Sequence, residues 1–221
     1  MGCLGWVGSF FSAIVLLFLG VSSTSAPPIS TGTDIDFERY EGISAERTED
    51  GGFILGDPDA PITIVAFEDF LCPHCQDFQP TIQEFITEYV ETGQARFEFR
   101  MLLIFPPSVF LFEMVECAAV VEDDPLMFWY AHDVVFSMFT DSAFDDAEFA
   151  STLGIPLDDL RECAEDADQY IIDQQLASDN NVIGTPTIRW RLDGGDLRSD
   201  IIPPQPTADQ IGELIALYGD N

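Results

Sequence analysis

The stretch CPHC, from Cys72 to Cys75, is the part of this sequence best equipped for chemistry. Two cysteines separated by two residues can be a reactive dithiol, half of a zinc site or a static disulfide. No second CxxC pair and no HxxxH pair follows to complete a zinc site. His132 could be a further ligand, but it stands among aromatic residues, as hydrogen-bonded core histidines often do. The pattern therefore favours a redox pair that needs no metal and no organic cofactor, with a zinc- or peptide-binding module without turnover as the alternative.

Cys72 directly precedes a predicted helix, and this position sets its chemistry apart from that of Cys75. Pro73 suits the first helical position, where an N–H would have no partner, so Cys72 is expected to be the N-cap. Free backbone amides and the helix dipole stabilise a thiolate there, and His74 would stabilise it further. The acidic residues that precede Cys72 would disfavour the thiolate, but the amides and His74 are expected to outweigh them. Because stabilising the dithiol makes the disulfide a stronger oxidant, the stretch predicts an oxidase, with Cys75 as the less exposed resolving thiol.

The charge of the chain excludes one class of partner and suggests a setting. The formal net charge is −32, and none of the 8 lysine or arginine residues is a lysine. So negative a surface repels the phosphate backbone, which excludes nucleic acid as a partner. Salt shortens the range over which carboxylates repel one another, so adaptation to high ionic strength is one hypothesis. An acidic exported protein with a well-solvated surface is the other.

Residues 1–26 predict export. An apolar run from Phe10 to Val21 is followed by small and polar residues, which is typical of a signal peptide cleaved after Ala26. No lysine or arginine precedes the run, and the apolar stretch that begins at Cys3 is almost long enough to span a membrane, so an uncleaved N-terminal anchor is the alternative. Either way, the folded part is expected outside the cytoplasm, in the periplasm or at the cell exterior, where conditions are oxidising.

The first half of the remaining chain has the pattern of a β-α-β unit. Residues 27–50 lack apolar periodicity and are expected to be a mostly extended linker, with order beginning near Gly52. A β-branched apolar run at 61–67 predicts a buried strand, helical spacing predicts a helix that Gly93 ends, and alternation at 95–101 predicts a second strand. Two parallel strands joined by a right-handed crossover should result, with the cysteines at the carboxyl end of the first.

A helical block then separates these strands from the end of the chain. Helical patterns extend from residue 108 to about 181 and include one long stretch at 156–178. Strand character returns at 187–192, a turn after it suggests a hairpin, and a last helix should begin after Thr207 as N-cap. The fold class expected is α/β, interrupted by a helical block. The expected domains are 51–107 with 182–221, and the insert 108–181.

A known family shares this arrangement. The stretch ITIVAFEDFLCPHCQDF, followed far downstream by GTPT, resembles the DsbA-like thiol-disulfide oxidoreductases of the thioredoxin superfamily. The resemblance extends from about Gly52 to Gly219 and implies a thioredoxin fold with an inserted helical domain. It also implies that Pro186 is a cis-proline opposite the cysteines and that Thr185 offers backbone groups to a substrate peptide.

One residue departs from the family pattern. The family has a buried acid six residues before the first cysteine, where this sequence has Ala66. Strand alternation puts Glu68 on the same face as Ala66, so Glu68 is a candidate for the proton-transfer role, and a solvated carboxylate is the alternative. Cys117 and Cys163 lie on separate predicted helices, and since some DsbA-like proteins have a second disulfide in the insert, a structural disulfide is expected.

The resemblance implies a function and its partners. The protein would oxidise thiols in reduced or unfolded exported proteins, and a membrane quinone-linked thiol oxidase would recycle it. A monomer is the default expectation, because nothing in the sequence resembles a dimerisation domain. A disulfide reductase or isomerase of the same fold is the alternative. The loop around Pro106 and Pro107 is the candidate for a substrate groove, whereas Trp129 and its neighbours are expected in the core.

Overall fold

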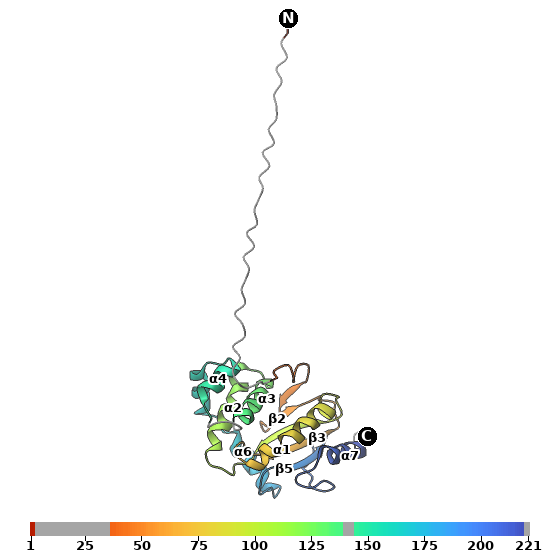
Figure 1. Ribbon diagram of the computed structural model, residues 1–221. Helices are drawn as coiled ribbons and strands as arrows, with labels where there is room; N and C mark the ends of the chain where they lie inside the picture. Colours follow the sequence, from red (N-terminus) through yellow and green to blue (C-terminus); the bar gives the residue numbers. More distant parts are fainter. Residues whose placement is uncertain (3–35, 139–143, 219–221) are drawn as a thin grey trace. The chain divides into compact units, whose positions relative to one another are not determined.

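The structure, a computed structural model, describes residues 1–2, 36–138 and 144–218 (Figure 1). The predicted signal peptide or anchor lies outside the described residues apart from its first two. The described chain from residue 36 onward is a mixed α/β fold built on a five-stranded sheet, in the order β1-β2-β4-β3-β5. None of the described helices is long and apolar enough to cross a membrane.

The sheet contains the β-α-β unit that the sequence predicts. β3 and β4 pair in parallel, whereas β3 with β5, β4 with β2 and β2 with β1 pair antiparallel. The two predicted parallel strands are thus confirmed. The strands are β1 (Ala45–Arg47), β2 (Phe53–Leu55), β3 (Ile62–Glu68), β4 (Arg96–Met101) and β5 (Thr187–Leu192).

Helices lie on both faces of the sheet (Figure 1). α1 contacts α7 on one face, and α6 packs against the other. Helices α2 to α6 all lie between β4 and β5 in the chain. The helices are α1 (Pro73–Phe85), α2 (Ser108–Glu122), α3 (Leu126–Met138), α4 (Asp146–Leu153), α5 (Leu157–Ala164), α6 (Gln169–Asp179) and α7 (Ala208–Tyr218).

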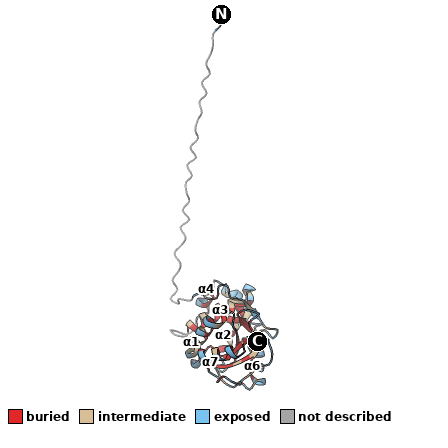
Figure 2. Cartoon of the chain, turned by 90° about the vertical axis from the view of Figure 1, so that its right-hand side faces the viewer, coloured by how far each residue is buried: buried red, intermediate tan, exposed pale blue. Residues whose placement is uncertain are grey.

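β3 is buried along its whole length, as its continuous apolar sequence predicts. Ile64 and Ala66 join the large core on the α1 face, while Val65 and Phe67 pack with Ala177 of α6 on the opposite face. Buried residues, red in Figure 2, accordingly concentrate in the sheet and on the helix faces that cover it. The strand that ends at the cysteines is therefore rigidly held from both sides.

The expectation of an extended linker up to residue 50 is wrong for residues 36–50. β1 lies in this segment and pairs with β2. Tyr40 is fully buried, and its hydroxyl donates a hydrogen bond to Asp133 of α3 at 2.8 Å. The segment has no apolar periodicity because a few aromatic contacts, such as that of Phe37 with Tyr130 of α3, and backbone pairing hold it, so order begins well before Gly52.

Several helix ends follow their sequence signals. A π-helical turn at Ile86–Val90 continues α1, and the chain leaves it at Gly93, whose φ is +72°. Thr207 caps α7 reciprocally with Gln210: the Gln210 N–H donates to the Thr207 hydroxyl at 3.3 Å, and the Thr207 N–H donates to the Gln210 side chain at 3.0 Å. The Thr207 prediction is confirmed.

Two expectations for the second half of the chain need correction. The helical stretch expected at 156–178 is divided into α5 and α6, because residues 165–168 leave the helix. The hairpin expected after β5 is reduced to a single bridge between Trp190 and Arg198. Arg198 instead places its guanidinium 4.1 Å from the centre of the Trp190 ring, which holds this turn against the sheet by a cation–π contact.

The charged face of β4 is buried, which its alternating pattern does not reveal. Arg100 is fully buried and forms ion pairs with Glu98 at 2.6 Å, with Asp173 of α6 at 2.8 Å and with Asp50 at 2.7 Å. Burial opposes its charge, but Glu98 and Asp173 raise the pKa of Arg100 further above its usual range. Buried charges persist only when paired in this way, so the network ties α6 and the segment before β2 to the sheet.

Candidate active site

The CPHC residues occupy the end of the β3–α1 connection and the first turn of α1. Cys72 is the N-cap in extended conformation, and Pro73 is the first helical residue. Cys72 is 5% exposed and Cys75 is 0% exposed, whereas His74 is exposed. Both cysteines carry free thiols, so the geometry is that of the dithiol form. Cys72 is the only one of the pair that a substrate sulfur could reach.

A loop from far downstream closes over Cys72. The peptide bond between Thr185 and Pro186 is cis, and Cys72 Sγ donates a hydrogen bond to the Thr185 carbonyl oxygen at 3.5 Å. The structure therefore brings together the three residues that the resemblance associates. The Cys72 thiol was expected to face the free amides of the helix, but its side chain makes no capping hydrogen bond with them. A protonated thiol is a weak donor, and here it faces a carbonyl acceptor instead.

Glu68, the last residue of β3, is fully buried beside Cys75 and is not the solvated carboxylate of the alternative. Its Oε2 accepts a hydrogen bond from Gln79 Nε2 of α1 at 3.0 Å. Burial raises the pKa of Glu68 to about 8, and the hydrogen bond from Gln79 opposes that rise. Burial and then the charge of Glu68 raise the pKa of the Cys75 thiol far above its usual range. Burial therefore favours the protonated form of both groups.

Gln79 was missed by the sequence reasoning, although a signal for it exists. It follows Cys75 by four residues, and residues four apart on a helix lie on the same face. A helix face that carries a buried thiol and then an amide next to a buried acid is a pattern that could have been found. Gln79 is accordingly a further candidate site residue.

Asp69, one of the acidic residues that precede Cys72 in the sequence, has a defined structural role. Its side chain accepts hydrogen bonds from the backbone N–H groups of Ile104 and Phe105 at 2.7 Å and 2.8 Å, and from the Ser108 hydroxyl. It also accepts from the Leu71 N–H at 2.9 Å, the Asx-turn geometry that an aspartate after a strand often adopts. Asp69 therefore fixes the loop after β4 beside the dithiol.

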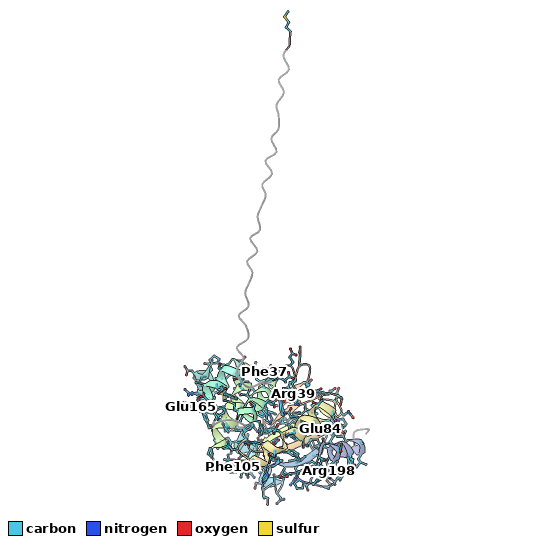
Figure 3. All side chains as sticks on the ribbon, in the orientation of Figure 1. Phe37, Arg39, Glu84, Phe105, Glu165 and Arg198 are labelled. Atoms are coloured by element: carbon cyan, nitrogen blue, oxygen red, sulfur yellow. A yellow bond between two sulfur atoms is a disulfide. The ribbon has the colours of Figure 1, made fainter. Side chains whose placement is uncertain are left out.

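This loop exposes apolar side chains. Ile104 and Phe105 are 42% and 39% exposed, and Pro106 and Pro107 are also exposed. Figure 3 shows Phe105 at the edge of the molecule. Ile183, in the loop that precedes the cis-proline, is 93% exposed. Apolar side chains thus project from both loops that are bonded to the dithiol region.

The remaining sequence candidates lie elsewhere. His132 is buried, with Nδ1 3.1 Å from Asp133 Oδ1 and its ring packed against aromatic side chains. Among the described residues no cluster of three or more histidine, cysteine or acidic side chains could hold a metal ion. A disulfide joins Cys117 of α2 to Cys163 of α5, and Trp129 is fully buried in the core.

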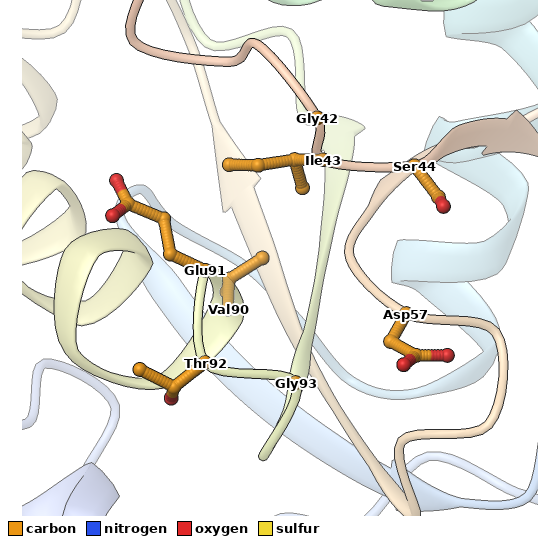
Figure 4. A pocket seen from close by; sticks show the side chains of 8 residues that line it. All are labelled: Gly42, Ile43, Ser44, Asp57, Val90, Glu91, Thr92 and Gly93. Carbon is orange, nitrogen blue, oxygen red and sulfur yellow. The ribbon is translucent and has the colours of Figure 1, made fainter.

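A pocket of about 290 Å³ lies away from the cysteines (Figure 4). The segment before β1 and the turn after the π-helical residues form its walls, and backbone atoms at Gly42 and Gly93 are part of them. Its polar side chains are those of Ser44, Asp57, Glu91 and Thr92. It contains no thiol and no residue of the site described above.

Comparison with known proteins agrees with this geometry. A family model described as Thioredoxin matches residues 48–193. The chain belongs to the thioredoxin family. Disulfide bond formation protein D of Bacillus subtilis is 27% identical over 165 residues, covering 67% of this chain and 71% of that protein. The Na⁺/H⁺ antiporter NhaA 3 of Salinispora tropica is 28% identical over 142 residues, covering 62% of this chain but 21% of the antiporter, so the chain spans about a fifth of that relative.

Solved structures with a similar fold include proteins named DsbA and BdbD. Alpha-DsbA1 of Wolbachia pipientis has a TM-score of 0.65 at 18% identity, covering 76% of this chain and 90% of that one. Oxidised BdbD of Bacillus subtilis has a TM-score of 0.62 at 24% identity, covering 81% of this chain and 98% of that one. The predicted fold class, a thioredoxin fold of the DsbA-like type, is confirmed. In its fold, this member of the thioredoxin family therefore resembles solved structures that are named DsbA and BdbD.

Proposed function

We propose that this protein introduces disulfides into reduced exported proteins by thiol-disulfide exchange at Cys72 and Cys75. The observation that carries the proposal is the contact between Cys72 Sγ and the Thr185 carbonyl, 3.5 Å apart, in front of the cis peptide bond to Pro186. An extended substrate strand could pair with the backbone at Thr185 and bring its own sulfur to Cys72.

The reaction divides the work between the two cysteines. A substrate thiolate attacks Cys72 Sγ of the oxidised protein, a new S–S bond forms, and the Cys72–Cys75 bond breaks with its electron pair on Cys75. A second substrate thiolate then attacks the substrate sulfur of the mixed disulfide and displaces Cys72. The substrate leaves with a disulfide and the protein with two thiols, so electrons balance without a cofactor.

Glu68 would supply the proton that Cys75 needs when it leaves. Its position beside Cys75 and its full burial support this role, as does its pKa of about 8, which burial raises from the usual value. His74, exposed at the first turn of α1, would stabilise a negative sulfur on Cys72, and Pro73 sets the start of that helix.

Substrates would bind across the two apolar loops. The exposed side chains of Ile104, Phe105 and Ile183 suit unfolded chains, which present apolar residues that folded proteins conceal. The signal-like pattern at residues 1–26 supports an extracytoplasmic location. There, a membrane quinone-linked thiol oxidase would reoxidise the dithiol.

Trapping the mixed disulfide tests the proposal. The Cys75→Ala variant retains the thiol of Cys72 and should accumulate a covalent complex when it is mixed with an oxidised, unfolded secreted protein. The Cys72→Ala variant should form little such complex, because the Cys75 sulfur is enclosed. Equal trapping by both variants, or by neither, would refute the assigned roles.

A reductase or isomerase is the second candidate, and one observation favours it. The sulfur of Cys72 makes no capping hydrogen bond with the helix amides, so the dithiol receives less stabilisation than its N-cap position suggested. A weakly stabilised dithiol corresponds to a more reducing couple.

A further inference from the structure

Glu68 and Gln79 meet through one hydrogen bond that leaves one oxygen of each group without a partner. Gln79 Nε2 donates to Glu68 Oε2 at 3.0 Å. Glu68 Oε1 and Gln79 Oε1 are both buried, and neither has a hydrogen-bond partner within the described part of the chain. Buried polar atoms in folded proteins nearly always have a partner, so these two oxygens require a physical explanation.

A proton on Glu68 would supply that explanation. A carboxylate oxygen and an amide oxygen are both acceptors only, so they cannot bond to each other. A neutral carboxylic acid both donates and accepts, as a primary amide does, and the two groups can close a ring of two hydrogen bonds. The bond from Gln79 Nε2 to Glu68 Oε2 is one half of that ring. The two unpartnered oxygens are the atoms that the other half would join.

We propose that Gln79 is a positioning residue that holds Glu68 as a neutral acid through this pair of hydrogen bonds, ready to protonate Cys75. The inference rests on the proposed exchange reaction. When the Cys72–Cys75 bond breaks, its electron pair goes to Cys75 Sγ, and Glu68 transfers its proton to that sulfur. The Glu68 carboxylate that remains keeps the hydrogen bond from Gln79 Nε2, and a proton from solvent restores the acid.

The surroundings of Glu68 are consistent with this assignment. On α1 the groups that face it are Cys75 and Gln79, and on β4 the residue opposite in register is Met101, which carries no charge. Asp69, next in the chain, directs its carboxylate to the N–H groups of the loop after β4. Burial favours the neutral form of Glu68, in agreement with its raised pKa.

A route for the replacement proton lies on the other side of Gln79. Gln79 lines a surface pocket of about 230 Å³, together with Gln83 of α1, Asp133 of α3 and Arg39. The charged residues that line this pocket are Asp36, Arg39 and Asp133. Arg39 donates a hydrogen bond to the Gln83 carbonyl, and the Gln83 side chain donates one to Asp133, each at 3.5 Å. The acid–amide pair thus stands between the enclosed thiol and a recess that admits water.

The test compares two glutamines of the same helix. Gln79→Leu removes both proposed hydrogen bonds, and Gln79→Met, closer in length, serves as a second variant if leucine packs poorly. Gln76→Leu is the matched control, because Gln76 Nε2 donates to the Phe70 carbonyl at 3.2 Å and not to Glu68. Infrared difference spectra against Glu68→Gln isolate the carbonyl band of the protonated Glu68 side chain in the full-length reduced protein. The pH profile of disulfide opening by a small dithiol gives the second readout.

The expected result is specific to Gln79. Its variants should move the Glu68 band to the higher frequency of an acid with fewer hydrogen bonds and slow disulfide opening several-fold near neutral pH. Gln76→Leu should leave both readouts at the wild-type values. A Glu68 band that coincides in wild-type protein and both Gln79 variants would overturn the inference. If the disulfide of the wild-type protein does not react with dithiols at all, the proposed function is refuted. The position of the Glu68 band would still show whether Glu68 and Gln79 form the two hydrogen bonds.

Discussion

The guanidinium group of Arg100 lies against the backbone of Gly52. A Cβ atom added at residue 52 would lie 2.3 Å from Arg100 Cζ. The guanidinium cannot withdraw without breaking its ion pairs with Glu98 and Asp173. Gly52 is therefore required by this close approach, at the point where the chain enters β2.

Gly52→Ala should destabilise the protein by about 2 kcal/mol or more, since the added methyl group displaces a buried, fully paired side chain. Urea unfolding followed by circular dichroism measures the change. Gly184→Ala is the matched control, because a Cβ there meets no atom within 4 Å. Equal stability of Gly52→Ala and wild-type protein would contradict the described packing.

Arg100→Leu should cost about 3–5 kcal/mol of unfolding free energy, because it leaves Asp173 buried without a counter-charge and leaves Glu98 with Arg191 alone. The loss should shrink as the pH falls and Asp173 takes up a proton. Arg161→Leu, which breaks the exposed pair with Asp146, should cost only about 0–1 kcal/mol. Similar losses in the two variants at neutral pH would show that the Arg100 network is not a buried one.

The parts of this fold that could be predicted are those written in local patterns. β3 is a continuous apolar run, apolar and charged residues alternate along β4, and Thr207 precedes a helix. Each of these signals can be recognised within a few residues of sequence. The position of Cys72 at the start of α1 was predicted in the same way, from Pro73 as the first helical residue.

What escaped prediction depends on contacts between distant residues. Tyr40 orders the segment before β1 through Asp133, 93 residues away, and nothing near Tyr40 in the sequence signals it. The burial of Arg100 likewise depends on Asp173, 73 residues away. At the site, Gln79 matters only because the end of β3 brings Glu68 against α1. Local periodicity in the sequence cannot predict contacts between residues that lie so far apart along the chain.

Glu68→Gln should change how stability depends on pH. The pKa of Glu68 rises from 4.5 to about 8 on folding, so between these values the unfolded chain releases a proton that the folded protein keeps. Wild-type stability should therefore fall as pH rises from about 4.5 to about 8 relative to the variant. We expect equal stability near pH 4 and an advantage of about 1–3 kcal/mol for Glu68→Gln near pH 8.

Thermal unfolding across that pH range gives the comparison. Glu84→Gln is the control for removing one carboxylate, because Glu84 lies on the exposed side of α1 (Figure 3). Parallel curves for wild-type protein and Glu68→Gln would mean that Glu68 is ionised in the folded protein at neutral pH, contrary to its burial.

Loss of the disulfide between Cys117 and Cys163 should destabilise the protein without abolishing exchange at Cys72. The bond closes a loop with a sequence separation of 46, which corresponds to about 4 kcal/mol in the chain-entropy view. The double variant Cys117→Ala with Cys163→Ala should unfold at lower urea concentration and still form a mixed disulfide. Unchanged stability would show that the bond constrains nothing in the unfolded chain.

The reduction potential of the Cys72–Cys75 pair tests the proposed function most directly. Equilibration of the protein in glutathione buffers at high salt, with the thiols counted by alkylation, gives the value. An oxidase requires a potential well above that of thioredoxin, about −270 mV, and nearer to the value of about −120 mV for DsbA. A potential at or below the thioredoxin value would contradict the oxidase account and assign the protein to the reductase class.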